Sequence, residues 1–325
     1  MNPNEAPPVV ASPIADLSYR GYDGPLRAHP ARWWIVALAG IRAAFKNRWF
    51  WALAAGAFLP YVFHGLIFYV TTVFAPQGGG GPPMMGSDAN GQRYAMVFFQ
   101  AFTGFEWLWL FAIALMVGAG SIASDNGANA LQVYLSKPIT KADYLLGKWM
   151  SIFLMVSFVA LAPAVLMYAF LGAACANLGF FKNEPLLFPH VVLACLIPGA
   201  IHASLLVGFS AWCTSSRIAG ALYAAFTFAS KILVGILWMV HYDHNPAKGL
   251  LLQHGSVDGV ISGLAQRVYG IAVQVSPMFR RRAMMGDPII PPPNVLALGG
   301  IALGACLLAI AAARWRIRAV EVVRG

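Results

Sequence analysis

The stretch LQVYLSKPITKADYLLGK, from Leu131 to Lys148, holds four charged residues, a proline and a glycine between two of the most apolar segments of the chain. Charged residues make up only 10% of the 325 residues, whereas hydrophobic residues make up 59%. Soluble domains contain roughly 45–50% apolar residues. The composition therefore indicates an integral membrane protein, and the polar stretch between its apolar segments requires an explanation.

Six apolar runs are long enough to cross a bilayer, since about 20 helical residues span a hydrocarbon core of roughly 30 Å. They cover approximately residues 51–73, 95–122, 150–174, 190–212, 218–240 and 295–313. We therefore predict an all-α polytopic membrane protein with one transmembrane domain over residues 31–325. Pro60, Pro163 and Pro198 lie inside three of the runs. We expect kinks there, because neighbouring helices can satisfy the freed carbonyls.

Lysine and arginine predict the orientation, because these residues are retained on the cytoplasmic side during insertion. With both termini in the cytoplasm, 14 of them flank the spans on that side, against two in the short outer loops, Arg93 and Lys182. The loop between the fifth and sixth spans carries five more, including the run Arg280 to Arg282. A re-entrant fold or a seventh crossing at that run would reverse the C-terminal assignment. We expect the cytoplasmic (inner) membrane of a bacterium.

The N-terminal region predicts two elements. Residues 1–30 contain prolines and charges but no apolar core, which indicates a disordered cytoplasmic tail rather than a signal peptide. In residues 31–48, Arg32, Arg42 and Lys46 fall on one helical face, with Trp33 and Ala37 among the residues roughly opposite. A basic amphipathic helix with tryptophans suits the headgroup plane. The alternative is a cytoplasmic extension of the first span.

Several catalytic and cofactor motifs are absent from the sequence. It has no GxxxxGK[ST] stretch, so the chain cannot hold ATP in a P-loop, and it has no HExxH motif. The four cysteines lack paired spacing, so neither a disulfide framework nor a metal site is indicated. His241, Asp243, His244 and His254 can ligate metals, but their spacing fits no defined site. We expect no catalytic residue, no metal and no nucleic-acid partner.

The opening stretch predicts a helical elbow between the second and third spans. A first short helix runs from about Asp125 to Leu135, and the acidic residue near its start complements the helix dipole. Lys137-Pro138 stops it, because a residue before proline is pushed out of the helical region. Thr140 to Asp143 then resembles a capping box, with Asp in place of Glu or Gln, and opens a second helix that continues into the third span.

This arrangement resembles the permease subunits of ABC-2 type ATP-binding cassette transporters. The resemblance rests on Asp125-x-Gly127, the leucine-containing segment 131–135, Ser136-Lys137-Pro138-Ile139 and Tyr144-Leu145-Leu146-Gly147-Lys148. Ala128 stands where the family often has threonine, and Lys141 where it often has arginine. The basic tail from Arg314 to Val323 is also similar to the family pattern. The specific resemblance covers about 35 residues.

The resemblance implies a coupling helix that docks on a separate ABC ATPase subunit, which would bind ATP-Mg, and a second permease copy or paralogue. We expect Leu131, Tyr134 and Leu135 to be apolar docking residues, with Lys137, Lys141 and Asp143 as a polar rim. The coupling segment as a whole comprises Asp125, Leu131, Tyr134, Leu135, Ser136, Lys137, Pro138, Lys141 and Asp143. The alternative is an ordinary surface loop.

Two ionisable residues within the spans are functional candidates, because a charge in the bilayer costs roughly 2.5–3.5 kcal/mol on insertion scales. Glu106 lies in the second predicted span and Lys231 near the middle of the fifth. They could pair across the bundle or line a polar path; Lys231 could also snorkel, and Glu106 is closer to the interface. His64 and His202 are expected to be hydrogen-bonded core residues.

The loop between the last two spans predicts an amphipathic helix. Apolar residues recur there at helical spacing, opposite Asp258, Gln266 and Gln274. They are Val257, Val260, Ile261, Leu264, Val268, Ile271, Ala272 and Val275. The helix could cover the exit of the transport path, or simply pack against the outer ends of the spans.

We therefore expect an ABC transporter permease subunit, an exporter in contact with membrane lipids, without an ATPase site of its own. One alternative is an ATPase-independent channel or ion-coupled secondary transporter in which Glu106 and Lys231 form the relay. Another is a membrane scaffold whose ATPase drives complex assembly. The few polar side chains in the spans suggest an amphipathic or hydrophobic cargo.

Overall fold

The computed structural model describes residues 31–73, 93–104, 106–130, 139–242, 252–271, 273–274, 289–290 and 293–317. The predicted tail, residues 1–30, lies outside the described residues, as does the run Arg280 to Arg282. The described part is helical apart from turns and one pair of two-residue strands, which confirms the all-α prediction.

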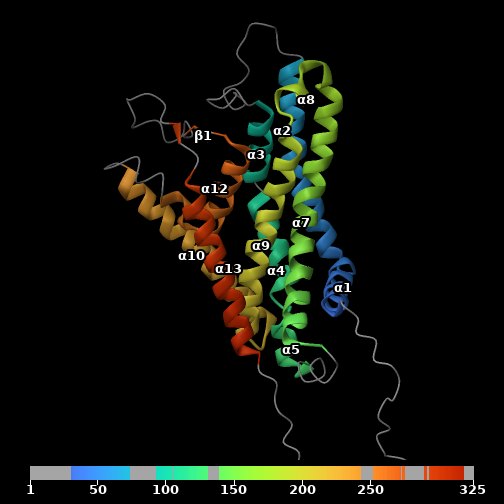
Figure 1. The fold of residues 1–325 in the computed structure, drawn as a ribbon, viewed down its shortest axis with the longest axis vertical. Helices are drawn as coiled ribbons and strands as arrows, with labels where there is room; N and C mark the ends of the chain where they lie inside the picture. Colours follow the sequence, from blue (N-terminus) through green and yellow to red (C-terminus); the bar gives the residue numbers. More distant parts are fainter. Residues whose placement is uncertain are drawn as a thin grey trace, which may run out of the picture. The chain divides into compact units, whose positions relative to one another are not determined.

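The elements follow one another along the chain as coloured in Figure 1. The helices are α1 (Arg32–Phe45), α2 (Arg48–Val73), α3 (Arg93–Thr103), α4 (Glu106–Gly118), α5 (Ala123–Gly127), α7 (Lys141–Ala174), α8 (Phe180–Asn183), α9 (Leu187–Trp212), α10 (Ser216–Tyr242), α12 (Val257–Tyr269) and α13 (Val295–Arg316). Short 3₁₀ turns cover Ala176–Leu178 and Gln253–Gly255. Strand β1 (Val273–Gln274) pairs antiparallel with β2 (Ile289–Ile290).

Six helices of the described part are long and apolar enough to cross a membrane, which confirms the predicted number. They are Arg48–Thr72, Leu108–Gly127, Lys141–Ala174, Leu187–Trp212, Ser216–Leu237 and Val295–Arg316. The helices α2, α7 and α9 continue through Pro60, Pro163 and Pro198. All three prolines are buried, where neighbouring helices can compensate for the lost hydrogen bonds.

The second predicted span, 95–122, is wrong as one continuous helix. It consists of α3 and α4, which are separated near Gly104. Glycine is among the weakest helix formers, and the hydroxyl of the preceding Thr103 donates to the Phe99 carbonyl (2.9 Å). Such back-bonding often bends helices. Glu106 therefore stands at the first turn of α4 rather than inside a helix; its side chain lies outside the described residues.

Helix α9 is the central element of the bundle. It packs against α7, α13, α12, α10 and α4. In its most apolar segment 72% is buried, whereas the buried share of the corresponding segment is 17% in α10 and 6% in α13. Figure 1 shows α7 running alongside both α2 and α9. The faces that α10 and α13 leave uncovered are apolar, as lipid or another membrane subunit would require.

Helix α1 is separate from the first span and packs against α7. The chain turns at Lys46 and Asn47, and the Asn47 side-chain oxygen accepts from the backbone N–H of Trp49 (3.0 Å). Close approach to α7 depends on Gly147, where an added Cβ would lie 2.6 Å from the Trp33 carbonyl. The predicted amphipathic helix therefore forms and is not a continuation of the span; its position in the headgroup plane remains a prediction.

Candidate functional site

A cluster of three polar side chains joins α5 to the first turns of α7. Asp125 Oδ2 accepts from the Tyr144 hydroxyl (2.6 Å) and lies 2.7 Å from Lys148 Nζ. The Lys148 amine also stands 5.4 Å from the centre of the Tyr144 ring. Asp125 and Lys148 are only 17% and 15% exposed. This Asp125 cluster (Asp125, Tyr144 and Lys148) therefore holds together the two ends of the polar segment.

A second cluster joins α5 to the end of α9. The fully buried Ser210 hydroxyl accepts from the backbone N–H groups of Ile122 (3.0 Å) and Ala123 (2.8 Å), and donates to the Ala119 carbonyl (2.9 Å). It thereby provides hydrogen-bond partners for two N–H groups and one carbonyl at the turn from α4 into α5. Burying these backbone groups without partners would cost free energy. The Asn126 amide donates to the carbonyls of Ala211 (3.1 Å) and Cys213 (3.0 Å). We call Ser210 and Asn126 the Ser210 cluster.

The predicted capping box opens α7. The Thr140 hydroxyl accepts from the Asp143 N–H (3.1 Å), and Asp143 Oδ2 accepts from the Thr140 N–H (3.1 Å). The shorter aspartate therefore closes the box in place of glutamate. Its carboxylate also accepts from the Thr140 hydroxyl (2.7 Å), so Asp143 fixes the start of the helix.

The structure describes three of the nine predicted coupling residues: Asp125, Lys141 and Asp143. Lys141 is exposed at the first position of α7. The others lie outside the described residues; they are Leu131, Tyr134, Leu135, Ser136, Lys137 and Pro138. Sequence reasoning did not select Tyr144, Lys148, Asn126 or Ser210 as site residues. The spacing of Tyr144 and Lys148, one helical turn apart, could have identified the first two as a pair on one face.

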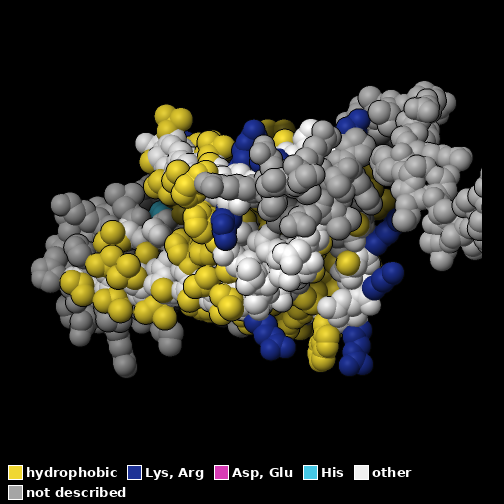
Figure 2. Space-filling model, turned by 90° about the horizontal axis from the view of Figure 1, so that it is seen from below, with side chains coloured by type: hydrophobic (Ala, Val, Ile, Leu, Met, Phe, Trp, Pro, Cys, Tyr) yellow, Lys and Arg dark blue, Asp and Glu magenta, His cyan; other side chains and the backbone are white. Residues whose placement is uncertain are grey.

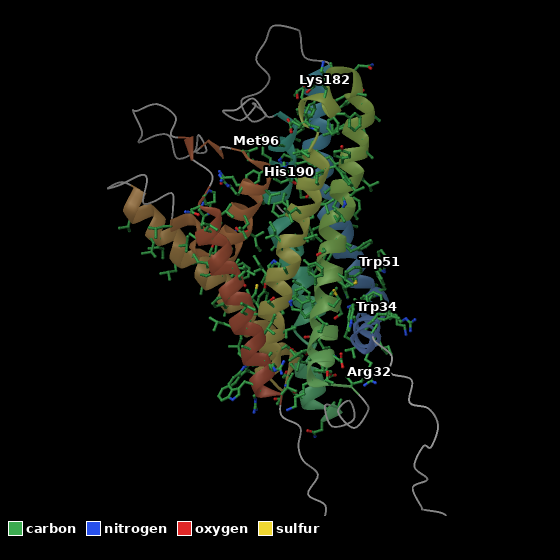
Figure 3. The ribbon with its side chains drawn as sticks, in the orientation of Figure 1. Arg32, Trp34, Trp51, Met96, Lys182 and His190 are labelled. Atoms are coloured by element: carbon green, nitrogen blue, oxygen red, sulfur yellow. The ribbon has the colours of Figure 1, made fainter. Side chains whose placement is uncertain are left out.

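Basic side chains surround the end of the bundle that carries α1 and α5. Exposed ones there include Arg42, Lys46, Lys141, Arg217 and Arg316. Figure 2 views this end and shows Lys and Arg side chains around its rim, with hydrophobic side chains between them. Figure 3 places Arg32 at this end and Lys182 at the opposite one. The charge asymmetry that predicted the topology is therefore present among the described helices.

The predicted loop helix forms as α12 at the other end, but it ends at Tyr269 rather than near Val275, and Gln274 lies in strand β1. The Ser256 hydroxyl caps it by accepting from the Gly259 N–H (3.0 Å), and Gly270 ends it with a left-handed φ of 68°. Gln266 was predicted on the polar face, but it is buried at 3% exposure. Its amide donates to the Ile271 carbonyl (3.3 Å), so that the buried polar group is satisfied. Gln274's side chain lies outside the described residues.

Lys231 forms an ion pair with α12. Its Nζ lies 3.0 Å from Asp258 Oδ2, and the two side chains are 38% and 30% exposed. The pair links α10 to the first turn of α12, where a carboxylate also complements the helix dipole. Burial lowers the pKa of nearby His254 below its ordinary value, although the contact of its Nδ1 with the Gly259 carbonyl acts in the opposite direction.

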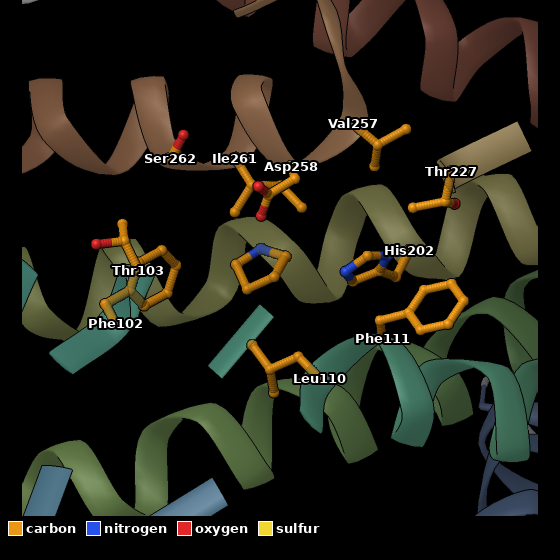
Figure 4. A pocket seen from close by; sticks show the side chains of 11 residues that line it. Phe102, Thr103, Leu110, Phe111, His202, Thr227, Val257, Asp258, Ile261 and Ser262 are labelled. Atoms are coloured by element: carbon orange, nitrogen blue, oxygen red, sulfur yellow. The ribbon is translucent and has the colours of Figure 1, made fainter. Parts of the chain in front are cut away.

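A small cavity lies beneath α12 (Figure 4). It has a volume of about 30 Å³ and takes polar side chains from α3, α9, α10 and α12: Thr103, His202, Thr227, Asp258 and Ser262. A cavity needs roughly 10–15 Å³ to hold one water, so this space suits water rather than a bulky cargo. His202 is buried and hydrogen-bonds the Tyr223 hydroxyl, which confirms it as a hydrogen-bonded core residue. His64 contacts the Pro60 carbonyl of its own helix but is only half-buried, so the prediction of a core position is wrong for it.

The described residues contain no group of three His, Cys, Asp or Glu side chains placed to hold a metal ion. Of the predicted cluster of His241, Asp243, His244 and His254, only His254 has a described side chain. The site at the α1 end is instead a set of hydrogen bonds and one ion pair that connects α4, α5, α7 and α9.

Comparison with protein families gives a match that covers most of the chain. Residues 34–311 match the family described as ABC-2 family transporter protein. The chain belongs to the ABC-2 transporter family. This agrees with the resemblance carried by the polar elbow, and it makes the chain an integral membrane component of a transporter. A comparison with curated proteins finds no match. The Asp125 cluster joins α5 and α7, the two helices that flank residues 131–138, and the Ser210 cluster joins α5 to α9.

The Asp125 cluster predicts a measurable loss of stability. Tyr144→Phe removes the hydrogen bond to Asp125 and keeps the ring, and we expect a loss of about 1.5–3 kcal/mol, the usual range for a hydrogen bond to a charged group. Asp125→Asn also removes the partner of Lys148. Thermal unfolding of the purified protein in detergent measures both. The double variant should lose less than the sum of the singles; additive losses would show that the two side chains do not interact.

The ion pair between α10 and α12 predicts recovery on charge exchange. Lys231→Asp and Asp258→Lys should each lower thermal stability, because each places two like charges together next to apolar surface. The double variant restores opposite charges and should regain at least half of the loss. Lys182→Asp, at an exposed position on α8, is the control for a charge change alone. A double variant as unstable as the sum of its singles would contradict the pairing.

Proposed function

We propose that the chain is the permease subunit of an ATP-binding cassette exporter, driven by a separate ATPase subunit that binds ATP-Mg. The polar elbow supplies the docking segment, with Leu131, Tyr134 and Leu135 as apolar contacts and Lys137 and Lys141 as basic ones. A second permease copy or paralogue completes the transport path. The chain itself would bind no nucleotide, since it contains no P-loop sequence.

The observation that carries the proposal is the anchoring of both ends of the elbow. On one side, α5 is attached to α9 by the Ser210 cluster and to α7 by the Asp125 cluster. On the other side, the Thr140–Asp143 capping box begins a helix of 34 residues that crosses the bundle. A displacement of the segment between them would therefore move α4, α7 and α9. An unanchored surface loop would dissipate the same displacement.

The same end of the bundle has the charge expected of a cytoplasmic face. Its exposed lysines and arginines come from α1, α7, α10 and α13. This supports an orientation with the N- and C-termini in the cytoplasm, where an ATPase subunit could reach the elbow. We place the protein in a bacterial inner membrane, with α12 on the outer side. Among the described residues, the cavity beneath α12 is too small for a cargo, in keeping with a transport path that the second permease completes.

Charge reversal in the elbow tests this proposal. We expect Lys137→Glu/Lys141→Glu to lower the ATPase that copurifies with the tagged protein by about tenfold or more, which corresponds to 1.4 kcal/mol of binding free energy. The measurement is ATP hydrolysis per permease after mild detergent extraction from the native membrane. Lys182→Glu/Arg267→Glu makes the same charge change at exposed residues of α8 and α12 and should leave the activity unchanged.

Either of two results would count against the proposal. Equal ATPase recovery from the elbow variant and the wild type would exclude this docking surface. Failure to recover any ATPase with the wild type, under conditions that preserve complexes, would favour an ion-coupled transporter with Lys231 in its pathway.

A further inference from the structure

A second, larger cavity lies at the α1 end, where α1 crosses α4 and α7. Its volume is about 250 Å³. The small residues Gly40, Ala43 and Ala44 leave room on the α1 side, and Ala43 is exposed, so the cavity opens outward there. The other walls include Gly120 and Ser121, which follow α4, and Lys148 and Ser151 of α7.

Three of the polar groups that line this cavity can donate hydrogen bonds, whereas the Ser151 hydroxyl already donates to the Lys148 carbonyl (2.8 Å). Ser121 Oγ is buried and has no hydrogen-bond partner among the described residues. The Asn47 amide nitrogen contacts Met116 Sδ at 3.5 Å, and a thioether is a weak acceptor. Lys148 brings an ammonium group, whose charge is shared with Asp125 at 2.7 Å. A buried hydroxyl without a partner is uncommon in folded proteins and indicates a missing ligand or water.

The surroundings of the cavity favour a ligand from the membrane over one from solution. Trp34, Trp49 and Trp51 are exposed around the junction of α1 and α2, at 41%, 63% and 51%. Tryptophans concentrate at the level of the lipid headgroups. Arg42 on α1 and Lys46 in the turn that follows it are exposed, and basic pockets between helices on the cytoplasmic side attract anionic headgroups.

We propose that this cavity binds the phosphate of an anionic phospholipid of the inner leaflet. The Ser121 hydroxyl, the Asn47 amide and the Lys148 ammonium donate to the phosphate oxygens, and the acyl chains extend past α1 into the bilayer. Lys148 then contacts both the lipid and Asp125, so the bound lipid joins α1 to the Asp125 cluster. The proposal requires α1 to lie at the membrane surface, but it does not depend on the ATPase partner.

Lipid binding to the purified, delipidated protein tests this inference. Native mass spectrometry and thermal unfolding would compare phosphatidylglycerol, phosphatidylcholine and inorganic phosphate as added ligands. We expect phosphatidylglycerol to bind at least tenfold more tightly than phosphatidylcholine and to raise the unfolding temperature. Inorganic phosphate should have little effect, because it lacks the acyl chains.

Two variants remove the site in different ways. Ser121→Val replaces the unpaired hydroxyl with a methyl group and fills part of the cavity. Asn47→Asp keeps the side-chain oxygen that accepts from Trp49, but it repels a phosphate. Both should abolish the preference for phosphatidylglycerol, whereas Ser124→Val, at an exposed position on α5, should retain it.

Three results would overturn the inference. Equal binding of the two phospholipids by the wild type would show that no headgroup site exists. Equal stabilisation by inorganic phosphate and phosphatidylglycerol would assign the cavity to a free anion. An unchanged preference in Asn47→Asp would place the headgroup elsewhere, even if Ser121→Val failed to fold.

Discussion

The carboxylate of Asp125 and the hydroxyl of Ser210 fix the position of α5, and the elbow depends on both. A helix of five residues has no stability of its own in water. Here the Ser210 hydroxyl accepts from the backbone N–H at the start of α5. The Asp125 carboxylate accepts from the Tyr144 hydroxyl and pairs with the Lys148 ammonium. These partners come from α9 and α7, which are the two most buried of the candidate spans. The residues on either side of the polar segment are therefore attached to the most buried part of the bundle.

Helix α9 connects the two ends of the molecule. Its Ser210 lies at the elbow, whereas Pro198 and His202 line the cavity beneath α12. Most of the helix is buried, so a displacement at one end meets packed side chains along its whole length. At the far end, the ion pair of Lys231 with Asp258 attaches α12 to α10. A movement of α9 relative to α10 would therefore act on the contacts that hold α12 in place.

The sequence predicted the features that depend on local patterns. Apolar runs of about 20 residues predict spans because the bilayer imposes that length, and Thr140 and Asp143 predict a helix start because their contact is local. The break at Gly104 was missed, since hydropathy does not report backbone hydrogen bonding. Ser210 could not be identified as a site residue from the sequence, because its partner is distant along the chain. Its hydroxyl accepts a hydrogen bond from the N–H of Ile122, 88 residues away. The pairing of Lys231 with Asp258 and the burial of Gln266 likewise depend on how α12 packs.

The most direct test of this account is hydrogen–deuterium exchange of the protein in nanodiscs. It would compare α5 (Ala123–Gly127) with α8 (Phe180–Asn183), a helix of similar length at the other end. If the Asp125 and Ser210 clusters anchor α5 to the bundle, its amides will exchange more slowly than those of α8, and Ser210→Ala together with Asp125→Asn will remove that difference. If α5 exchanges as fast as α8 in the wild type, or stays protected in the double variant, the elbow is not held by these contacts and the proposed path of force is wrong.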